Sequence, residues 1–225
     1  MRNLTVRDVT TVDGDGIAVS GTGNRVEHNV VRNIYRQGIL LHTDAANATI
    51  IGNDVRDVGQ AGSNQDHGIY VQGNGHLVID NVFANMHGGY GIHVYPSSSN
   101  VTIAQNTVIN SQTRSGILID TSGGNITVVN NILVGNTDYG ILNRQCALGG
   151  CLVDHNLAWN NGLGATSGPA SNTLQTDPQF IDSNYHLAST SPAVNTARPD
   201  YSYSPDHDGT PRPQGNAPDI GAYER

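Results

Sequence analysis

The sequence predicts an all-β fold, a right-handed single-stranded parallel β-helix of about seven three-stranded rungs. A Gly-Ile pair recurs six times, at spacings of 22, 30, 23, 25 and 24 residues, and this is a solenoid period. Each pair opens a short run in which apolar residues alternate, the pattern of a strand with one buried face. We therefore expect the six runs to pair in parallel as one sheet. The pairs begin at Gly16, Gly38, Gly68, Gly91, Gly116 and Gly140.

A second repeated column, of Asn and one Asp, confirms the register independently. Its members recur at intervals of 21, 24, 28, 25, 25 and 25 residues, each after an alternating apolar run. Asn tolerates the backbone geometry of a bend, and its amide both donates and accepts hydrogen bonds along a stack. We expect a buried ladder at a bend between two strands. The column comprises Asp8, Asn29, Asn53, Asn81, Asn106, Asn131 and Asn156.

Composition supports this fold and limits the partners. The 225 residues include 27 Gly and only 5% aromatic residues, which suits short strands joined by tight turns. The net charge of −8, with 11 Arg and no Lys, argues against nucleic acid and anionic membranes as partners. No apolar run is long enough to span a membrane. A neutral glycan, or an acidic one held by Arg or a cation, remains compatible, and the sequence leaves the oligomeric state open.

The chain is expected to form one domain in two parts. Residues 1–165 carry the rungs, and residues 166–225 read as a C-terminal capping segment that continues the same domain, similar to the tail of many secreted bacterial β-helix proteins. Because the sequence is strand-like from Met1, we expect an exported, secreted or cell-surface bacterial protein whose export signal and N-terminal cap lie outside these residues. Cys146 and Cys151 flank a Gly-rich turn, and a disulfide is expected; two buried free thiols are the alternative.

No cofactor is required by the sequence, but Ca²⁺ is possible. The tail holds a group of acidic residues with one His, and turn and cap chemistry is the favoured interpretation of it over a calcium site. The identity of any metal ligand stays open. The group comprises Asp206, His207, Asp208 and Asp219.

Polar and aromatic residues gather on the outer face of the Gly-Ile strands at rungs two to five. The two outward columns hold only Ala and Ser on the first rung and include Leu elsewhere, but His, Tyr, Gln and Asp gather in them on rungs two to five. The turn from Val58 to His67 is also longer than its equivalents and could wall a cleft. Such a face predicts a binding or catalytic site for an extended polymer, although each residue alone could be an ordinary solvated strand residue.

The rungs resemble the parallel β-helix repeats of the pectate-lyase-like superfamily. The stretch from Gly89 to Asn110 is similar to repeats of mannuronan C-5 epimerases and of the alginate lyase and chondroitinase B group. The epimerases carry a Tyr-Gly-Phe-Asp-Pro-His motif, where this chain has Tyr90-Gly91-Ile92-His93-Val94-Tyr95. His93 stands in place of the catalytic Asp and Tyr95 in place of the His, which argues against epimerase activity. The Lys base of the alginate lyase group is ruled out because the chain has no Lys.

The resemblance favours lyase-like β-elimination on a glycan that contains uronic acid. Such a reaction needs a cation beside the carboxylate, a base and an acid. Arg114 or a bound cation could serve as the first, His93 or His67 as the base, and Tyr70 or Tyr95 as the acid. The residues expected to bind the polysaccharide are Arg36, His42, Asp66, Gln72, Tyr90, Tyr95 and Asp120.

The sequence also leaves two other classes of function open. A non-catalytic glycan-binding or structural solenoid would explain the repeat by itself. A glycoside hydrolase would need two carboxylates about 5 to 9.5 Å apart, and Asp66 and Asp120 are the evident pair, expected to lie too far apart.

Overall fold

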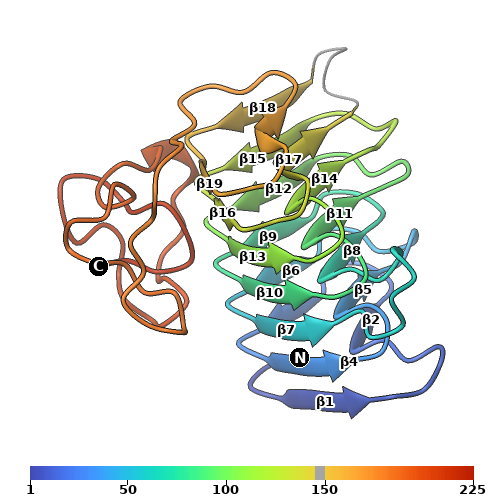
Figure 1. Ribbon diagram of the computed structural model, residues 1–225. Helices are drawn as coiled ribbons and strands as arrows, with labels where there is room; N and C mark the ends of the chain where they lie inside the picture. Colours follow the sequence, from blue (N-terminus) through green and yellow to red (C-terminus); the bar gives the residue numbers. More distant parts are fainter. Residues whose placement is uncertain (145–149) are drawn as a thin grey trace.

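The computed structural model describes residues 1–144 and 150–225 and shows a right-handed parallel β-solenoid with three sheets (Figure 1). Each complete rung contributes one strand to each sheet, and every strand pairs in parallel with its counterparts on the neighbouring rungs. Within residues 1–144 and 150–225, six rungs have all three strands and a seventh has two, which agrees closely with the prediction. Within the described ranges, no helix is long and apolar enough to cross a membrane.

We call the sheets 1, 2 and 3 in the order in which the chain enters them. Sheet 1 consists of β1 (Thr5–Val9), β4 (Val30–Ile34), β7 (Asp54–Val58), β10 (Val82–Met86), β13 (Thr107–Ser111), β16 (Ile132–Val134) and β19 (Leu157–Trp159). Sheet 2 consists of β2 (Ile17–Val19), β5 (Ile39–Leu41), β8 (Ile69–Val71), β11 (Ile92–Val94), β14 (Ile117–Ile119), β17 (Tyr139–Asn143) and β20 (Gly164–Ser167). Sheet 3 consists of β3 (Arg25–Glu27), β6 (Thr49–Ile51), β9 (Leu77–Ile79), β12 (Val101–Ala104), β15 (Ile126–Val129) and β18 (Cys151–Asp154).

Sheet 2 is built from the Gly-Ile strands in the predicted register. The Ile residues pair with one another from rung to rung and are fully buried in a core of Ile and Val. The Gly before each Ile is required by the close approach of the next rung. A Cβ on Gly68 would lie 2.5 Å from the carbonyl oxygen of Gly91, and one on Gly91 would lie 2.8 Å from that of Gly116. The Gly column is therefore a packing constraint and not a flexible hinge.

The Asn ladder lies between sheets 3 and 1, buried as predicted. Each Asn from Asn29 to Asn131 donates through Nδ2 to Oδ1 of the next, over 2.9 to 3.0 Å. The same Oδ1 also accepts the backbone N–H of the preceding Asn, as between Asn53 and Asn81 at 2.9 Å. The ladder thus satisfies the polar groups of the bend and ties each rung to the next.

The prediction was wrong for Asp8, which is exposed and does not belong to this ladder. Parallel pairing of β1 and β4 places Asp8 level with Asn33, whose Nδ2 donates to the Asp8 carboxylate over 2.8 Å. Asp8 instead heads a second, outward ladder on sheet 1. The residue level with Asn29 is Leu4, whose backbone N–H donates to Asn29 Oδ1. The first rung therefore has no Asn at the ladder position.

Most of the C-terminal segment lies along the side of the solenoid (Figure 1). Ser171 and Leu174 pair with the last rung, and the chain then turns back beside sheet 1. Arg212 is fully buried there between Asp80, at 3.0 Å, and Glu224, at 3.2 Å. Asp206 and Asp219 mainly accept backbone N–H groups within the tail. The tail therefore packs against sheet 1 from β7 onward and against the neighbouring edge of sheet 3, and it leaves the face of sheet 2 open.

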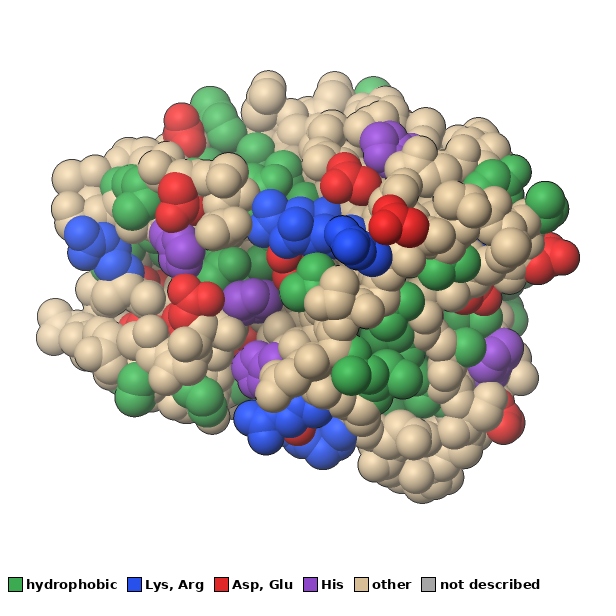
Figure 2. Space-filling view, turned by 90° about the horizontal axis from the view of Figure 1, so that it is seen from below, with side chains coloured by type: hydrophobic (Ala, Val, Ile, Leu, Met, Phe, Trp, Pro, Cys, Tyr) green, Lys and Arg blue, Asp and Glu red, His purple; other side chains and the backbone are tan. Residues whose placement is uncertain are grey.

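Seen from the end where β1 lies, acidic and basic side chains form small mixed groups, with hydrophobic side chains between them (Figure 2). Exposed apolar residues at this end include Leu4 and Val12. The predicted Cys146–Cys151 disulfide involves Cys146, which lies outside the described residues.

The ladder generates a prediction about stability. Replacing Asn106 with Ala removes the acceptor of the buried Asn81 backbone N–H and interrupts the ladder at its centre. We expect the free energy of unfolding to fall by at least about 1–3 kcal/mol, the usual penalty for one unsatisfied buried group. Urea denaturation measures it, with Ser122→Ala, at an exposed turn, as the control. Equal midpoints for the two variants would show that the ladder does not stabilise the fold.

Candidate functional site

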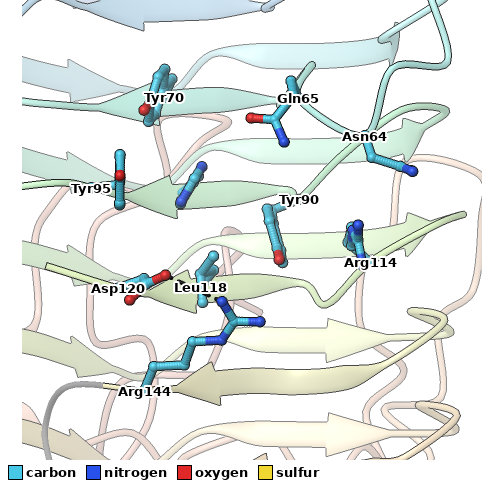
Figure 3. A pocket seen from close by; sticks show the side chains of 10 residues that line it. Asn64, Gln65, Tyr70, Tyr90, Tyr95, Arg114, Leu118, Asp120 and Arg144 are labelled. Carbon is cyan, nitrogen blue, oxygen red and sulfur yellow. Dashed lines mark hydrogen bonds and ion pairs between the residues drawn. The ribbon is translucent and has the colours of Figure 1, made fainter.

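One pocket of about 320 Å³ opens on the face of sheet 2, over strands β8, β11 and β14 (Figure 3). Tyr70, Tyr95 and Asp120 follow one side of it, and the loop before β8 and the residues before β11 and β14 form the other. The strands face their outward side chains into this space because residues alternate across a sheet. The lining residues are Asn64, Gln65, Tyr70, Tyr90, His93, Tyr95, Arg114, Leu118, Asp120 and Arg144.

Aromatic rings surround His93. Its imidazole stacks on Tyr70, with ring centroids 4.9 Å apart and an angle of 17° between the planes. Tyr90 and Tyr95 lie at 5.0 and 5.5 Å, and His67 meets the imidazole edge-on at 4.4 Å. Only 8% of His93 is exposed, although its neighbour Tyr95 is 41% exposed. His93 is thus a buried titratable group whose ring nevertheless contributes to the pocket wall.

His67 lies behind His93 and is joined to it by a hydrogen bond. His67 Nε2 is 2.8 Å from His93 Nδ1, and the backbone N–H of Tyr90 donates to His67 Nδ1 over 3.2 Å. His67 is only 1% exposed and does not line the pocket. The Nε2 atom of His93 is buried and has no hydrogen-bond partner among the residues that the structure describes.

Burial sets the protonation of the histidines and tyrosines. It lowers the pKa of His93 to about 4, against the opposing effect of the Asp120 charge, and it holds the pKa of His67 well below its usual value. Burial also raises the pKa of Tyr70 and that of Tyr90. At neutral pH the two imidazoles are therefore neutral, and both phenols are protonated.

Two guanidinium groups supply the positive charge of the pocket. Arg114 precedes β14, and its Nε is buried with no hydrogen-bond partner within the described ranges. Arg144 follows β17 and lies 3.3 Å from the Asp120 carboxylate (Figure 3). Asp120 is the one acidic side chain among the lining residues. An anion in this pocket would therefore lie near two cations, one of which is ion-paired to that carboxylate.

Several residues predicted for the site lie outside the pocket. Asp66 is buried, where its carboxylate accepts the Ser63 hydroxyl at 2.6 Å and lies 3.5 Å from Arg36 Nε. The two acids of the hydrolase alternative, Asp66 and Asp120, therefore do not share the pocket. His42 and Gln72 follow β5 and β8 and are partly exposed, but neither lines it. His67 is the buried neighbour of His93, so burial keeps it from direct contact with a substrate.

The lining also includes residues that were not expected from the sequence. Asn64 and Gln65 belong to the inserted turn, which the sequence indicated as a wall without singling out side chains. Leu118 and Arg144 stand in the outward columns, but they were not among the predicted site residues. The column register could have found Arg144, since it lies one rung beyond Asp120. The loop residues had no such signal, because an insertion has no counterpart in the repeat.

The loop is held in place by Gln37, a buried residue on the rung below. Its amide donates to the Gln65 carbonyl oxygen over 2.7 Å, and its Oε1 accepts the His67 backbone N–H over 2.7 Å. Gly59 and Gly88 permit close backbone contact beside it, since a Cβ on either would lie 2.8 Å from an atom of the other. One buried amide therefore positions both the loop wall and the backbone of His67.

Among the described residues, no group of three or more His, Cys, Asp or Glu side chains is arranged to hold a metal ion. In the tail, His186 lies between two carboxylates, 2.6 Å from Asp182 and 2.8 Å from Asp208. These hydrogen bonds raise the pKa of His186, although burial opposes them. This arrangement is that of an ion-paired imidazole.

Comparisons with known proteins agree with the fold. Residues 1–158 match the family model described as right handed beta helix region. The crystal structure of pectate lyase Pel9A is similar with a TM-score of 0.64 and 16% identity, covering 98% of this chain and 69% of that one. The periplasmic alginate epimerase AlgG is similar with a TM-score of 0.53 and 20% identity, covering 78% of this chain and 44% of that one. No curated protein sequence matches.

The buried imidazole makes stability depend on pH. The pKa of His93 is about 4 in the folded protein, whereas an unfolded chain titrates near 6.5. The unfolded state therefore binds the proton first, so stability present above about pH 6.5 is lost as the pH falls towards 4. We expect this one group to lower the free energy of unfolding by about 3 kcal/mol over that range. Urea unfolding at several pH values should show that the free energy of unfolding falls less steeply with decreasing pH in His93→Phe than in the wild type. An unchanged pH dependence would contradict a lowered pKa of His93 as its cause.

Proposed function

Because the chain belongs to the right handed beta helix family, we propose that it acts on an extended acidic polysaccharide, bound across the face of sheet 2. The observation that carries the proposal is a single pocket that combines two guanidinium groups with three tyrosine rings. Guanidinium groups pair with carboxylates through charge-assisted hydrogen bonds. Tyrosine rings offer apolar contact area together with a hydroxyl, which suits the faces and edges of a sugar ring.

The pocket is rich in hydrogen-bond donors. Arg114 and Arg144 donate only, and Asn64 and Gln65 add amide groups that also donate. Asp120 is the one carboxylate in the lining, and Arg144 lies close enough to pair with it. A uronate carboxylate therefore complements this lining better than a neutral sugar does.

The position of the pocket suits a polymer. Sheet 2 presents its outer face along the length of the solenoid, and the C-terminal segment covers sheet 1 instead. Pectate and alginate are the polysaccharides named for the two similar solved structures, and both are acidic. These names guide the choice of test polymers, since the likeness itself concerns the fold.

Lyase-like β-elimination is the reaction that we propose for this site. Asp120, the one carboxylate in the lining, would take up the proton from the carbon beside the uronate carboxylate, and a carbon–carbon double bond would form. The bond to the leaving sugar oxygen breaks, and that oxygen takes up a proton. The favouring observation is that Arg114 and Tyr70 border one pocket. Arg114 would pair with the carboxylate, and the protonated phenol of Tyr70 would donate its proton to the leaving sugar oxygen.

Binding is tested with a charge-removal variant. Arg114→Met should weaken binding to pectate or alginate by at least about tenfold, because a hydrogen bond between charged groups is lost. Arg32→Met is the matched control, since Arg32 pairs with Asp54 on sheet 1, away from the pocket. Isothermal titration calorimetry measures both variants. Equal affinities for the two, or no binding by the wild type, would exclude this pocket as the binding site.

The reaction is tested by the absorbance of the unsaturated product. Wild type should release such products from pectate or alginate, and Tyr70→Phe should lower the rate while affinity changes little, because the ring is kept and only the proton donor is lost. Binding without any unsaturated product would overturn β-elimination and leave the protein a glycan-binding solenoid.

A further inference from the structure

The hydrogen bonds of the two buried histidines determine where their protons lie. The backbone N–H of Tyr90 points at His67 Nδ1 over 3.2 Å. An amide N–H can only donate, so His67 Nδ1 must offer its lone pair. His67 is neutral, since burial holds its pKa well below the usual value. Its single ring proton therefore lies on Nε2.

The hydrogen bond from His67 also determines where the ring proton of His93 lies. His67 Nε2 carries a proton and lies 2.8 Å from His93 Nδ1, so His93 Nδ1 accepts that hydrogen bond. His93 is neutral as well, which leaves its own proton on Nε2. The opposite arrangement would give His67 a proton on Nδ1, and two N–H groups would then face each other at Tyr90. Only one pair of tautomers satisfies all three nitrogens.

We propose that His67 is a positioning residue that fixes His93 in the tautomer with the proton on Nε2. In this tautomer His93 presents an N–H donor to a carboxylate oxygen of the bound glycan. The identity of that acceptor rests on the proposed function; the tautomer does not. His93 Nε2 is buried and has no other partner among the described residues. A buried donor of this kind gains more from an incoming acceptor than an exposed one does, because it has already lost its water.

The residues around His67 hold its imidazole in position to accept the backbone N–H of Tyr90. Gln37 Oε1 accepts the His67 backbone N–H, which fixes the residue at the start of β8. A Cβ on Gly89 would lie 2.3 Å from His67 Nδ1 and 2.4 Å from the Asp66 carbonyl oxygen. Only Gly at this position lets the imidazole come close enough to accept the N–H of Tyr90.

The tautomer changes the role expected of His93. A neutral imidazole with its proton on Nε2 cannot accept a proton at that atom, so His93 is a hydrogen-bond donor in this state and not a general base. Its donor joins those of Arg114 and Arg144 around the same pocket. Nε2 is covered in this state, and Tyr95 is the most exposed ring beside it, so a glycan that displaces the Tyr95 ring would reach the donor. β-Elimination through His93 would first require its proton to move.

The test reads the tautomers directly in the ligand-free protein. Nitrogen-15 NMR of the imidazoles at neutral pH should show a protonated Nε2 and an unprotonated Nδ1 for both His67 and His93. A protonated Nδ1 on His93, or a charged imidazole, would overturn the proposal. Because no glycan is present, the measurement holds even if the proposed function fails.

Two variants separate a positioning role from a merely structural one. His67→Gln keeps an N–H donor of similar reach towards His93 Nδ1, so the Nε2–H tautomer should persist. His67→Phe keeps a ring but no donor, so His93 should populate both tautomers, and affinity for pectate or alginate should fall several-fold relative to His67→Gln. Circular dichroism checks that both variants keep the solenoid. If His67→Phe misfolds, the wild-type spectrum still decides the tautomer; identical His93 spectra in two folded variants would contradict the proposal.

Discussion

The stacking of one rung directly on the next is the constraint on which the rest of the structure depends. Parallel pairing brings backbone to within hydrogen-bonding distance along three sheets, so each bend must satisfy its polar groups in the same place on every rung. The Asn ladder does this with no spare capacity. Asn81 donates to Asn106 and to the carbonyl oxygens of Ile50 and Ile79, and it accepts two N–H groups of Asn53. A shift of one residue would break all of these bonds together, which is why the register is unique.

The site arises where the repeat is broken. Strands cannot gain a residue without losing register, but a turn can lengthen, and the turn before β8 is the longest of the described turns from sheet 1 to sheet 2. Gln37 then ties the added residues to the rung below, while Gly88 and Gly89 give them room. The regular rungs thus act as a rigid frame, and one insertion on that frame forms the wall of the pocket.

Charge is distributed unevenly over this frame. The chain carries a net charge of −8, and in the tail Arg212 is buried against Asp80 of the solenoid and Glu224. A buried ion pair of this kind holds the tail in one place, because removal of one partner would leave an uncompensated charge. The tail therefore covers sheet 1, and Arg114 and Arg144 give the open face of sheet 2 a local positive charge.

The sequence by itself determined the solenoid, the parallel Gly-Ile sheet and the buried Asn ladder, because each leaves a column at a fixed period. The period cannot separate two columns of the same residue type. Asn29 and Asn33 lie only four residues apart and belong to different ladders, and Asp8, which is level with Asn33, was therefore assigned to the ladder of Asn29. The outward columns placed Tyr70, His93, Tyr95 and Asp120 around one pocket. Only the tertiary structure decided that His67 is buried, that Gln37 holds the loop and that the tail lies beside sheet 1. Those outcomes depend on side-chain hydrogen bonds that join residues more than twenty positions apart, and the geometry of these bonds leaves no periodic pattern in the sequence.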